Sequence, residues 1–429
     1  MLDTIFTHIR QFQMIHYLAV FLAVALQIQI TLFANGDYLG LRIGLADLSL
    51  PLIGLFVLFS LVTKKSKLPE WSLRHMMFWL VALVFVMSLS LFNGYSVNGT
   101  LSSWALVNKY IGFFLLLAYL MLGGWIVTNT KDIRYVLSLF MVVFTGFFVL
   151  TIFMSMVTLF AQYFMPYPLW LPNYPWDGFM ANRNSFMVIF VLSFIFVVWG
   201  YKDGKMIMPT WISALFWISL PIFLVFNDSR TGWLASAILI IVFFLKHPIK
   251  RIKTCAPYLL LGFVIAYSSY SVTTNIAVLQ SMQAQNLLAL AGDTDYRGDQ
   301  KRYIAVEDGL ELYQQHNPFI GAGLGSYKPF QIEKRGKSID IIDFTGLWLL
   351  VETGAIGLVA FSGFFIACLW SLYRAGYAED SSSYHRAMFT FLILFVAMSV
   401  LHELMYTRIL WFAVGLALGR NVHTSVTKR

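Results

Sequence analysis

Arginine residues flanked by small polar side chains recur where long apolar segments begin. Arg183 lies in Ala-Asn-Arg-Asn-Ser, Arg230 lies in Asn-Asp-Ser-Arg-Thr-Gly, and Arg302 opens a helical pattern shortly after Arg297. A guanidinium group stays charged and binds two phosphate oxygens through parallel hydrogen bonds. One such arginine could equally extend its charge toward lipid headgroups. Several of them on one side of a membrane favour a site for an anion such as a pyrophosphate.

The long polar stretch 293–357 carries further groups that could do chemistry. An amphipathic helix is predicted over 302–315. Its apolar stripe consists of side chains at helical spacing: Tyr303, Val306, Leu310 and Tyr313. Basic and acidic residues follow the helix: Lys334, Arg335, Lys337, Asp340 and Asp343. A chain that is otherwise apolar and keeps one large polar loop often carries its chemistry in that loop.

A glycine-rich turn follows the predicted helix. Gly321, Gly323 and Gly325 could present backbone N–H groups to a phosphate. However, no strand precedes them and no Lys-Ser/Thr pair follows, so a turn that packs the helix onto the membrane domain explains them better. His316, at the end of the helix, is a candidate substrate contact. The alternative for this residue is a helix-end histidine that the helix dipole favours.

The composition places these groups on a membrane scaffold. Hydrophobic residues make up 59% and charged residues 12% of the 429 residues, and the mean hydropathy is +0.72. Soluble domains carry about 25% charged residues, so we predict an all-α polytopic membrane protein. The two cysteines, Cys255 and Cys368, fall in or beside apolar runs, where we expect small core residues without a disulfide.

About twelve apolar runs are long enough to cross a bilayer, which requires roughly 20 residues. They lie at 14–33, 46–63, 74–92, 105–127, 133–165, 185–201, 208–226, 231–246, 254–271, 344–373, 385–401 and 407–421. The first run carries no small-residue cleavage site, so we expect a retained span. The predicted organisation is nine spans in 1–271, a loop over 272–342, and three spans in 343–429.

Lysine and arginine in the short loops predict the orientation. With the N-terminus inside, 18 of the 30 basic residues fall on the cytoplasmic side, and seven of the others lie in the long loop, which is largely exempt from the rule. Both termini are therefore predicted to be cytoplasmic, and the loop faces outward. The net charge of +9 follows from this distribution. We expect contact with membrane lipid and no nucleic-acid partner.

Three stretches resemble the O-antigen ligase and polymerase superfamily: 228–232, the helix end and turn at 316–325, and 349–357. The stretches 41–47, which contains Arg42, and 181–185 also resemble it. The resemblance implies a bacterial glycosyltransferase with a GT-C-like fold. It implies work at the periplasmic face of the inner membrane on glycans carried by undecaprenyl pyrophosphate, without a nucleotide sugar, a cofactor or a metal.

The resemblance agrees with the role suggested above for the arginines. Arg230 and Arg302, supported by Arg183, are expected to bind the pyrophosphate of the donor. The further residues expected to contact the substrate are His316, Arg297 and Arg42.

One departure from the ligases concerns the residue that accepts a proton. The ligases carry a histidine where this chain has Asp343, at a fixed distance before a Gly-x-x-Gly that Gly354 and Gly357 match. A carboxylate can serve as general base if desolvation raises its pKa, and capping of the helix from Phe344 onward is an equal alternative for Asp343. Glu352 is a second candidate base, and a structural hydrogen bond is its alternative.

The missing histidine favours a polymerase that joins lipid-linked repeat units in a single inverting displacement at the anomeric carbon. The acceptor is then a glycan or another lipid-linked unit, and a protein that regulates chain length is a further expected partner. Ligation to a lipid A core and transfer to a protein remain alternatives. A lipid-linked glycan transporter is disfavoured because transporters carry repeats and ionisable groups near the midplane.

Overall fold

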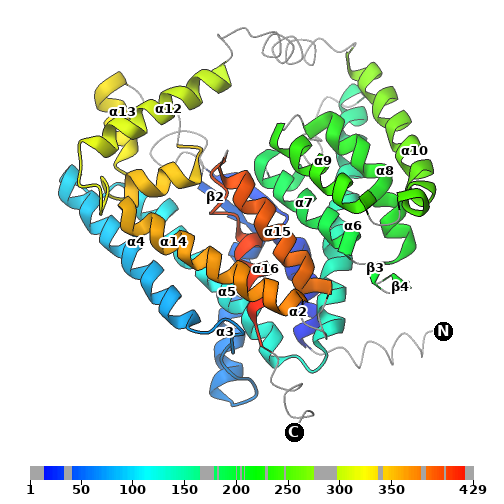
Figure 1. Cartoon of the computed structure of the whole chain (residues 1–429), viewed down its shortest axis with the longest axis horizontal. Coiled ribbons are helices and arrows are strands. Elements are labelled where there is room, and N and C mark those ends of the chain that lie inside the picture. Colours follow the sequence, from blue (N-terminus) through cyan, green and yellow to red (C-terminus); the bar gives the residue numbers. More distant parts are fainter. Residues whose placement is uncertain are drawn as a thin grey trace.

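The computed structural model describes residues 14–32, 41–164, 178–180, 183–199, 201–202, 205–206, 208–227, 230–245, 248–274, 297–336, 342–377, 383–400 and 402–420. Most of these residues are helical (Figure 1). The described strands form two short antiparallel pairs: β1 (Gln29–Leu32) with β2 (Leu41–Gly44), and β3 (Tyr201–Lys202) with β4 (Lys205–Met206). The predicted all-α class is therefore confirmed.

Each predicted apolar run contains a helix. Seven helical segments of the described chain are long and apolar enough to cross a membrane. They lie in α3 (Leu45–Val62), α4 (Met76–Asn98), η1 (Trp104–Ile111) with α5 (Gly112–Asn129), α6 (Ile133–Phe164), α8 (Thr210–Asn227), α10 (Pro248–Thr274) and α14 (Thr345–Tyr377). Five apolar helices are shorter: α2 (Met14–Ala25), α7 (Arg183–Trp199), α9 (Arg230–Leu245), α15 (Ser383–Ser399) and α16 (Arg408–Leu418). The count of twelve crossings stays a prediction.

The first predicted span, 14–33, is wrong at its carboxyl end. Helix α2 stops at Ala25, and the chain then enters β1, whose Gln29 pairs with Gly44 of β2. The side-chain amide of Gln27 donates hydrogen bonds to the carbonyls of Ala23 and Phe144, at 2.8 and 2.9 Å. The Gln27 side chain thus binds a carbonyl at the end of α2 and also joins this helix end to α6. A hydropathy pattern does not reveal such a contact.

The long polar stretch folds into two helices rather than one. Helix α12 (Arg297–Gln314) begins five residues before the predicted start, and α13 (Tyr327–Arg335) was not predicted. Both lie at one end of the bundle, above α4 and α14 (Figure 1). At the opposite end, the connection between α3 and α4 meets the end of α16, where Arg420 N–H donates to the Glu70 carbonyl at 2.7 Å.

The predicted apolar stripe of α12 is wrong for two of its four residues, whereas Val306 and Tyr313 are partly buried. Tyr303 is 72% exposed and Leu310 is 42% exposed, whereas the buried face carries Ala305, Asp308 and Leu312. Helix α12 packs against α13 and α14. Small side chains permit that close packing, and basic residues of α13 hold the buried acid, so tertiary contacts decide which face is covered.

The glycine-rich turn adopts a backbone that other residues rarely take. Gly321, Gly323 and Gly325 have φ values of 69°, 92° and 77°, in the left-handed region. A Cβ atom on Gly321 would lie 2.6 Å from the Val351 carbonyl oxygen, and one on Gly323 would overlap the backbone of Gly94. Glycine is therefore required both by the turn and by its close approach to α4 and α14.

The N–H groups of the turn are used for docking. Ala322 N–H donates to the Val351 carbonyl of α14, and Leu324 N–H donates to the Ser90 carbonyl of α4, both at 2.8 Å. These donors hold the turn against two helices and do not form a phosphate cradle. The structure supports the packing interpretation of the glycines.

The carboxyl-terminal helices lie at the seam of the bundle. Helix α15 contacts α14 on one side and α7 and α9 on the other (Figure 1). Helix α16 is buried along its whole length from Ile409 to Leu418 and packs on α5. The connection between α15 and α16 therefore reaches elements from both sides of the bundle.

Candidate functional site

The amino-terminal ends of α7, α9 and α14 meet at the connection 402–407. His402 is buried there, and its Nε2 lies 2.9 Å from Thr231 Oγ1 while its Nδ1 lies 3.3 Å from Asn184 Nδ2. The Thr345 hydroxyl donates to the His402 backbone carbonyl at 2.9 Å. One residue thus contacts the first turns of three helices that lie far apart in the sequence.

These contacts bring together three of the residues predicted from the sequence. Arg183 begins α7 and precedes Asn184, and Arg230 begins α9 and precedes Thr231. Asp343 lies two residues before α14. The side chains of Arg183 and Arg230 lie outside the described part of the chain. The contacts of their neighbours in the chain therefore place two predicted anion-binding residues and the predicted base near a common point.

Arg302 of α12 joins this group through Asp343. Its Nε donates to Asp343 Oδ2 at 3.1 Å, and the two side chains are 34% and 23% exposed. A predicted pyrophosphate contact and the predicted base are therefore direct partners that remain open to solvent. Helix α14 begins at Thr345, one residue later than the capping alternative for Asp343 expects, so Phe344 and not Asp343 directly precedes the helix.

Glu352 lies in a different environment from Asp343. It is 3% exposed, and its Oε2 accepts a hydrogen bond from Trp348 Nε1 at 2.8 Å. Its backbone carbonyl accepts a hydrogen bond from the Ser90 hydroxyl of α4 at 2.6 Å. Two residues later the helix is interrupted at Gly354, where φ is 67° and ψ is −172°. This arrangement favours the structural hydrogen bond over proton transfer for Glu352.

A largely buried ion pair joins the connection 402–407 to η1. Lys109 Nζ lies 2.6 Å from Glu403 Oε1, with side-chain exposures of 6% and 10%. The same ammonium lies over the rings of Trp348 and Tyr406, at 4.4 and 4.9 Å from their centroids. Lys109 belongs to the π-helix η1, a type of turn that is frequent at functional sites. The residues around His402 are consequently held in place by charge and aromatic contacts.

Arg42 lies near a second, partly buried ion pair. It belongs to β2, which leads into α3, and its side chain lies outside the described part. Asp47, in the first turn of α3, accepts hydrogen bonds from Tyr119 at 2.8 Å and from the N–H of Gly44 at 2.7 Å. Arg408 Nε lies 2.7 Å from Asp47 Oδ2. This pair fixes the end of the connection 402–407 to the strand that carries Arg42.

His316 and Arg297 lie at opposite ends of α12. The Nδ1 atom of His316 lies 2.9 Å from the Leu312 carbonyl, which can only accept, so Nδ1 carries the hydrogen. This contact agrees with the helix-end interpretation. At 1.5 Å of rise per residue, His316 is roughly 20 Å along the helix from Arg302. The structure therefore does not bring His316 to the Arg302–Asp343 pair. Arg297 is the first residue of α12, and its side chain lies outside the described part.

The basic cluster after α12 has a structural role. Arg335 binds both carboxylate oxygens of Asp308 at 2.8 Å, and Lys334 binds Asp308 at 2.8 Å and also Glu311. Burial raises the pKa of Asp308, but hydrogen bonds from Arg335, Lys334 and Gln331 outweigh it and lower the pKa to about 2. These charges clamp α13 onto α12. Lys337 and Asp340 lie outside the described residues.

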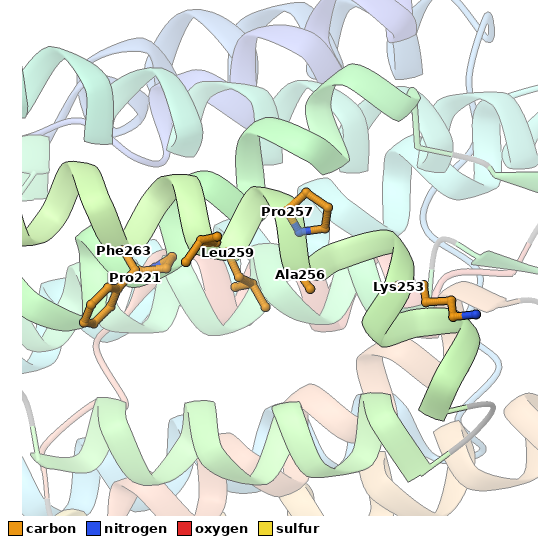
Figure 2. A pocket seen from close by; sticks show the side chains of 7 residues that line it. Pro221, Lys253, Ala256, Pro257, Leu259 and Phe263 are labelled. Atoms are coloured by element: carbon orange, nitrogen blue, oxygen red, sulfur yellow. The ribbon is translucent and has the colours of Figure 1, made fainter.

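A hollow between α8 and α10 lies apart from these groups (Figure 2). It has a volume of about 800 Å³, and Lys253 is the charged residue of its otherwise apolar lining. Its lining consists of Pro221, Lys253, Ala256, Pro257, Leu259, Leu260 and Phe263.

The described residues show no group of three or more His, Cys, Asp or Glu side chains that could hold a metal ion. Both cysteines are buried and free, as predicted.

Sequence reasoning missed His402, Glu403 and Lys109. The run His-Glu-Leu-Met-Tyr-Thr-Arg at 402–408 is a polar interruption between two apolar segments, and Lys109 opens another segment. Ionisable residues at the ends of apolar runs are therefore the signal that could have identified them. Their convergence on particular helices is visible only in the fold.

The fold and the site define a polytopic membrane protein that gathers arginine-bearing helix starts around a solvent-open Arg–Asp pair. Residues 214–362 match the family model described as O-Antigen ligase. This region contains the stretches 228–232, 316–325 and 349–357, so the match supports the resemblance to the O-antigen ligase and polymerase superfamily. It supports a glycosyltransferase of ligase or polymerase type in a multi-pass inner membrane protein. No curated protein matches the chain.

Proposed function

We propose that this protein is an O-antigen polymerase, which joins oligosaccharide repeat units carried on undecaprenyl pyrophosphate at the periplasmic face of the inner membrane. One observation carries the proposal: the helix starts that bear Arg183 and Arg230 meet beside Asp343, to which Arg302 is already bound. Three cationic residues and one carboxylate thus lie near one point. A pyrophosphate leaving group and an attacking hydroxyl require that combination.

The donor is held through its pyrophosphate by Arg230 and Arg302, with Arg183 in support. Guanidinium groups bind phosphate oxygens in pairs, and the amino-terminal ends of α7 and α9 add partial positive charge. As the bond from the anomeric carbon to the phosphate oxygen breaks, negative charge grows on the pyrophosphate. Positive charge that the arginines already hold beside the pyrophosphate stabilises this negative charge and so lowers the activation barrier.

Asp343 is the base in this mechanism. The acceptor hydroxyl oxygen attacks the anomeric carbon from the face opposite the pyrophosphate, which inverts the configuration, and its proton passes to the Asp343 carboxylate. Undecaprenyl pyrophosphate leaves with the electron pair of the broken bond. Asp343 binds Arg302 in the structure, so a pyrophosphate that competes for Arg302 would release the carboxylate for this role.

The remaining predicted residues are assigned to the glycan part of the substrates. His316, Arg297 and Arg42 lie at other points of the loop helices and strand β2. We place the loop 272–342 in the periplasm between nine spans before it and three after it, with both termini in the cytoplasm. A protein that regulates chain length is a further proposed partner, and the enzyme requires no metal or cofactor.

Ligation to a lipid A core is the second candidate, because the matched family model is described as O-Antigen ligase. Polymerisation is preferred since Asp343 stands where the ligases carry histidine. Deletion of the gene and examination of the surface polysaccharide test the choice. A cap of one repeat unit supports the polymerase, a bare core supports the ligase, and loss of protein glycosylation supports transfer to protein.

A further inference from the structure

Both ring nitrogens of His402 have a defined role in the network. Asn184 Nδ2 is a donor, so the Nδ1 atom that faces it accepts. In a neutral imidazole the hydrogen is then on Nε2, which donates to Thr231 Oγ1. The ring therefore connects α7 to α9 with one accepted and one donated hydrogen bond.

These contacts are not a consequence of chain connectivity. His402 lies 171 residues from Thr231 and 218 residues from Asn184 along the sequence. Its backbone carbonyl also accepts from Thr345, 57 residues away. A histidine on a third segment thus determines how far apart the first turns of α7 and α9 lie, and where α14 begins relative to them.

The segment that carries His402 is itself firmly held. The next residue, Glu403, forms the buried ion pair with Lys109, and Tyr406 donates to the Lys109 carbonyl at 2.9 Å. At the end of the segment, Arg408 is paired with Asp47. A ring mounted on a fixed segment can impose its geometry on the helices that it contacts.

We infer that His402 is a positioning residue: it holds the starts of α7 and α9 at the separation at which Arg183 and Arg230 engage one pyrophosphate beside Asp343. The inference rests on the proposed function, because it assigns a purpose to the spacing of those arginines. His402 is only 5% exposed. Its single acceptor nitrogen is used by Asn184, so it is not the base for the acceptor hydroxyl.

The test uses the purified full-length protein in a membrane mimetic with lipid-linked repeat units. In His402→Leu the donor KM should rise on the order of tenfold or more with a smaller change in kcat, because misplaced binding groups weaken a bidentate contact. Thr231→Val removes one hydrogen bond of the ring and should raise the donor KM about fivefold. His402→Gln supplies both a donor and an acceptor and should restore most of the loss.

His385→Gln is the matched control, since His385 is a partly buried histidine of α15 and no described hydrogen bond joins it to a residue of the site. Its kinetics should equal those of the parent. If His402→Leu does not fold, Thr231→Val and His402→Gln still decide the question. Unchanged donor KM in Thr231→Val and in every folded His402 variant would refute positioning. A fall in kcat alone, with a shifted pH profile, would equally refute it by placing His402 in the chemistry.

The activity of Arg230→Lys separates an error in the proposed function from an error in the role of His402. If Arg230→Lys is fully active, the pyrophosphate site itself is wrong, whatever His402 does. If Arg230→Lys is impaired while His402→Leu and Thr231→Val behave like the parent, only the role of His402 is wrong.

Discussion

Two regions of the molecule hold polar side chains in different ways. In the α12–α13 pair, the buried carboxylate of Asp308 accepts hydrogen bonds from Lys334, Arg335 and Gln331, so the charges neutralise one another. Such a cluster stabilises a fold and offers little to a ligand. We expect changes there to alter stability first.

At the starts of α7, α9 and α14, the side chains that contact His402 are neutral. His402 binds Asn184, Thr231 and Thr345, and these contacts set positions without neutralising any charge. The arginines are the neighbours of these residues in the chain. A basic cluster in the sequence, such as Lys334 and Arg335, is therefore a poor guide to an anion site, because buried and neighbouring acids bind it. We expect arginines at helix starts that are positioned by neutral contacts to be a better guide.

The largest effect is expected for the proposed base. In Asp343→Asn the polymerisation rate should fall roughly 100-fold or more, because an amide cannot take the proton. Asparagine has nearly the size and shape of aspartate, and the Asp343 side chain is 23% exposed, so folding and insertion should match the parent. Rates are measured with purified enzyme and lipid-linked repeat units. Full activity of Asp343→Asn would exclude it as the base and direct attention to Glu352→Gln.

A matched pair of substitutions sharpens the contrast between the two regions. Arg230→Lys keeps the charge but loses the paired hydrogen bonds, so activity should fall on the order of 10-fold to 100-fold. Arg335→Lys makes the same chemical change in the α12–α13 cluster and should leave activity nearly unchanged. Equal activity of the two variants in the same assay would remove the distinction between the regions.

The smallest effect concerns the pH dependence of the α12–α13 pair. The folded-state pKa of Asp308 is about 2, below its ordinary value of 3.8. Its ion pairs therefore stabilise the pair of helices fully above about pH 4, and that contribution is lost as the pH falls from about 4 toward 2. The protection of the α12 and α13 amides against hydrogen exchange, relative to the intrinsic exchange rate at each pH, should fall over this range. In Asp308→Asn the amides of α12 and α13 should be less protected at neutral pH, and their protection should change less with pH. If the variant shows the same pH dependence as the parent, a group other than Asp308 causes the effect.

Much of the fold could be predicted because bilayer-spanning helices are specified by composition. The starts of α7 and α9 were also readable, since Arg183 and Arg230 each stand at the edge of an apolar run. The covered face of α12 was not, because α13 and the ion pairs of Asp308 decide which side is buried. No local pattern specifies a contact between residues 231 and 402.

Only part of the candidate site could be predicted, because its residues are recognisable one by one while their contacts depend on the fold. The Arg302–Asp343 pair joins two residues that the sequence singled out separately, but their contact depends on how α12 lies over α14. The π-helix that carries Lys109 was read as the start of an ordinary span. The buried ion pair with Glu403 was consequently missed.

The central claim is tested most directly by the products of the purified protein in liposomes that contain a defined undecaprenyl-pyrophosphate repeat unit. We expect a ladder of longer glycans that remain lipid-linked, with one undecaprenyl pyrophosphate released for each new linkage. Arg230→Lys should yield little of either product. Transfer only when a lipid A core is supplied, or release of undecaprenyl pyrophosphate without longer glycans, would contradict it.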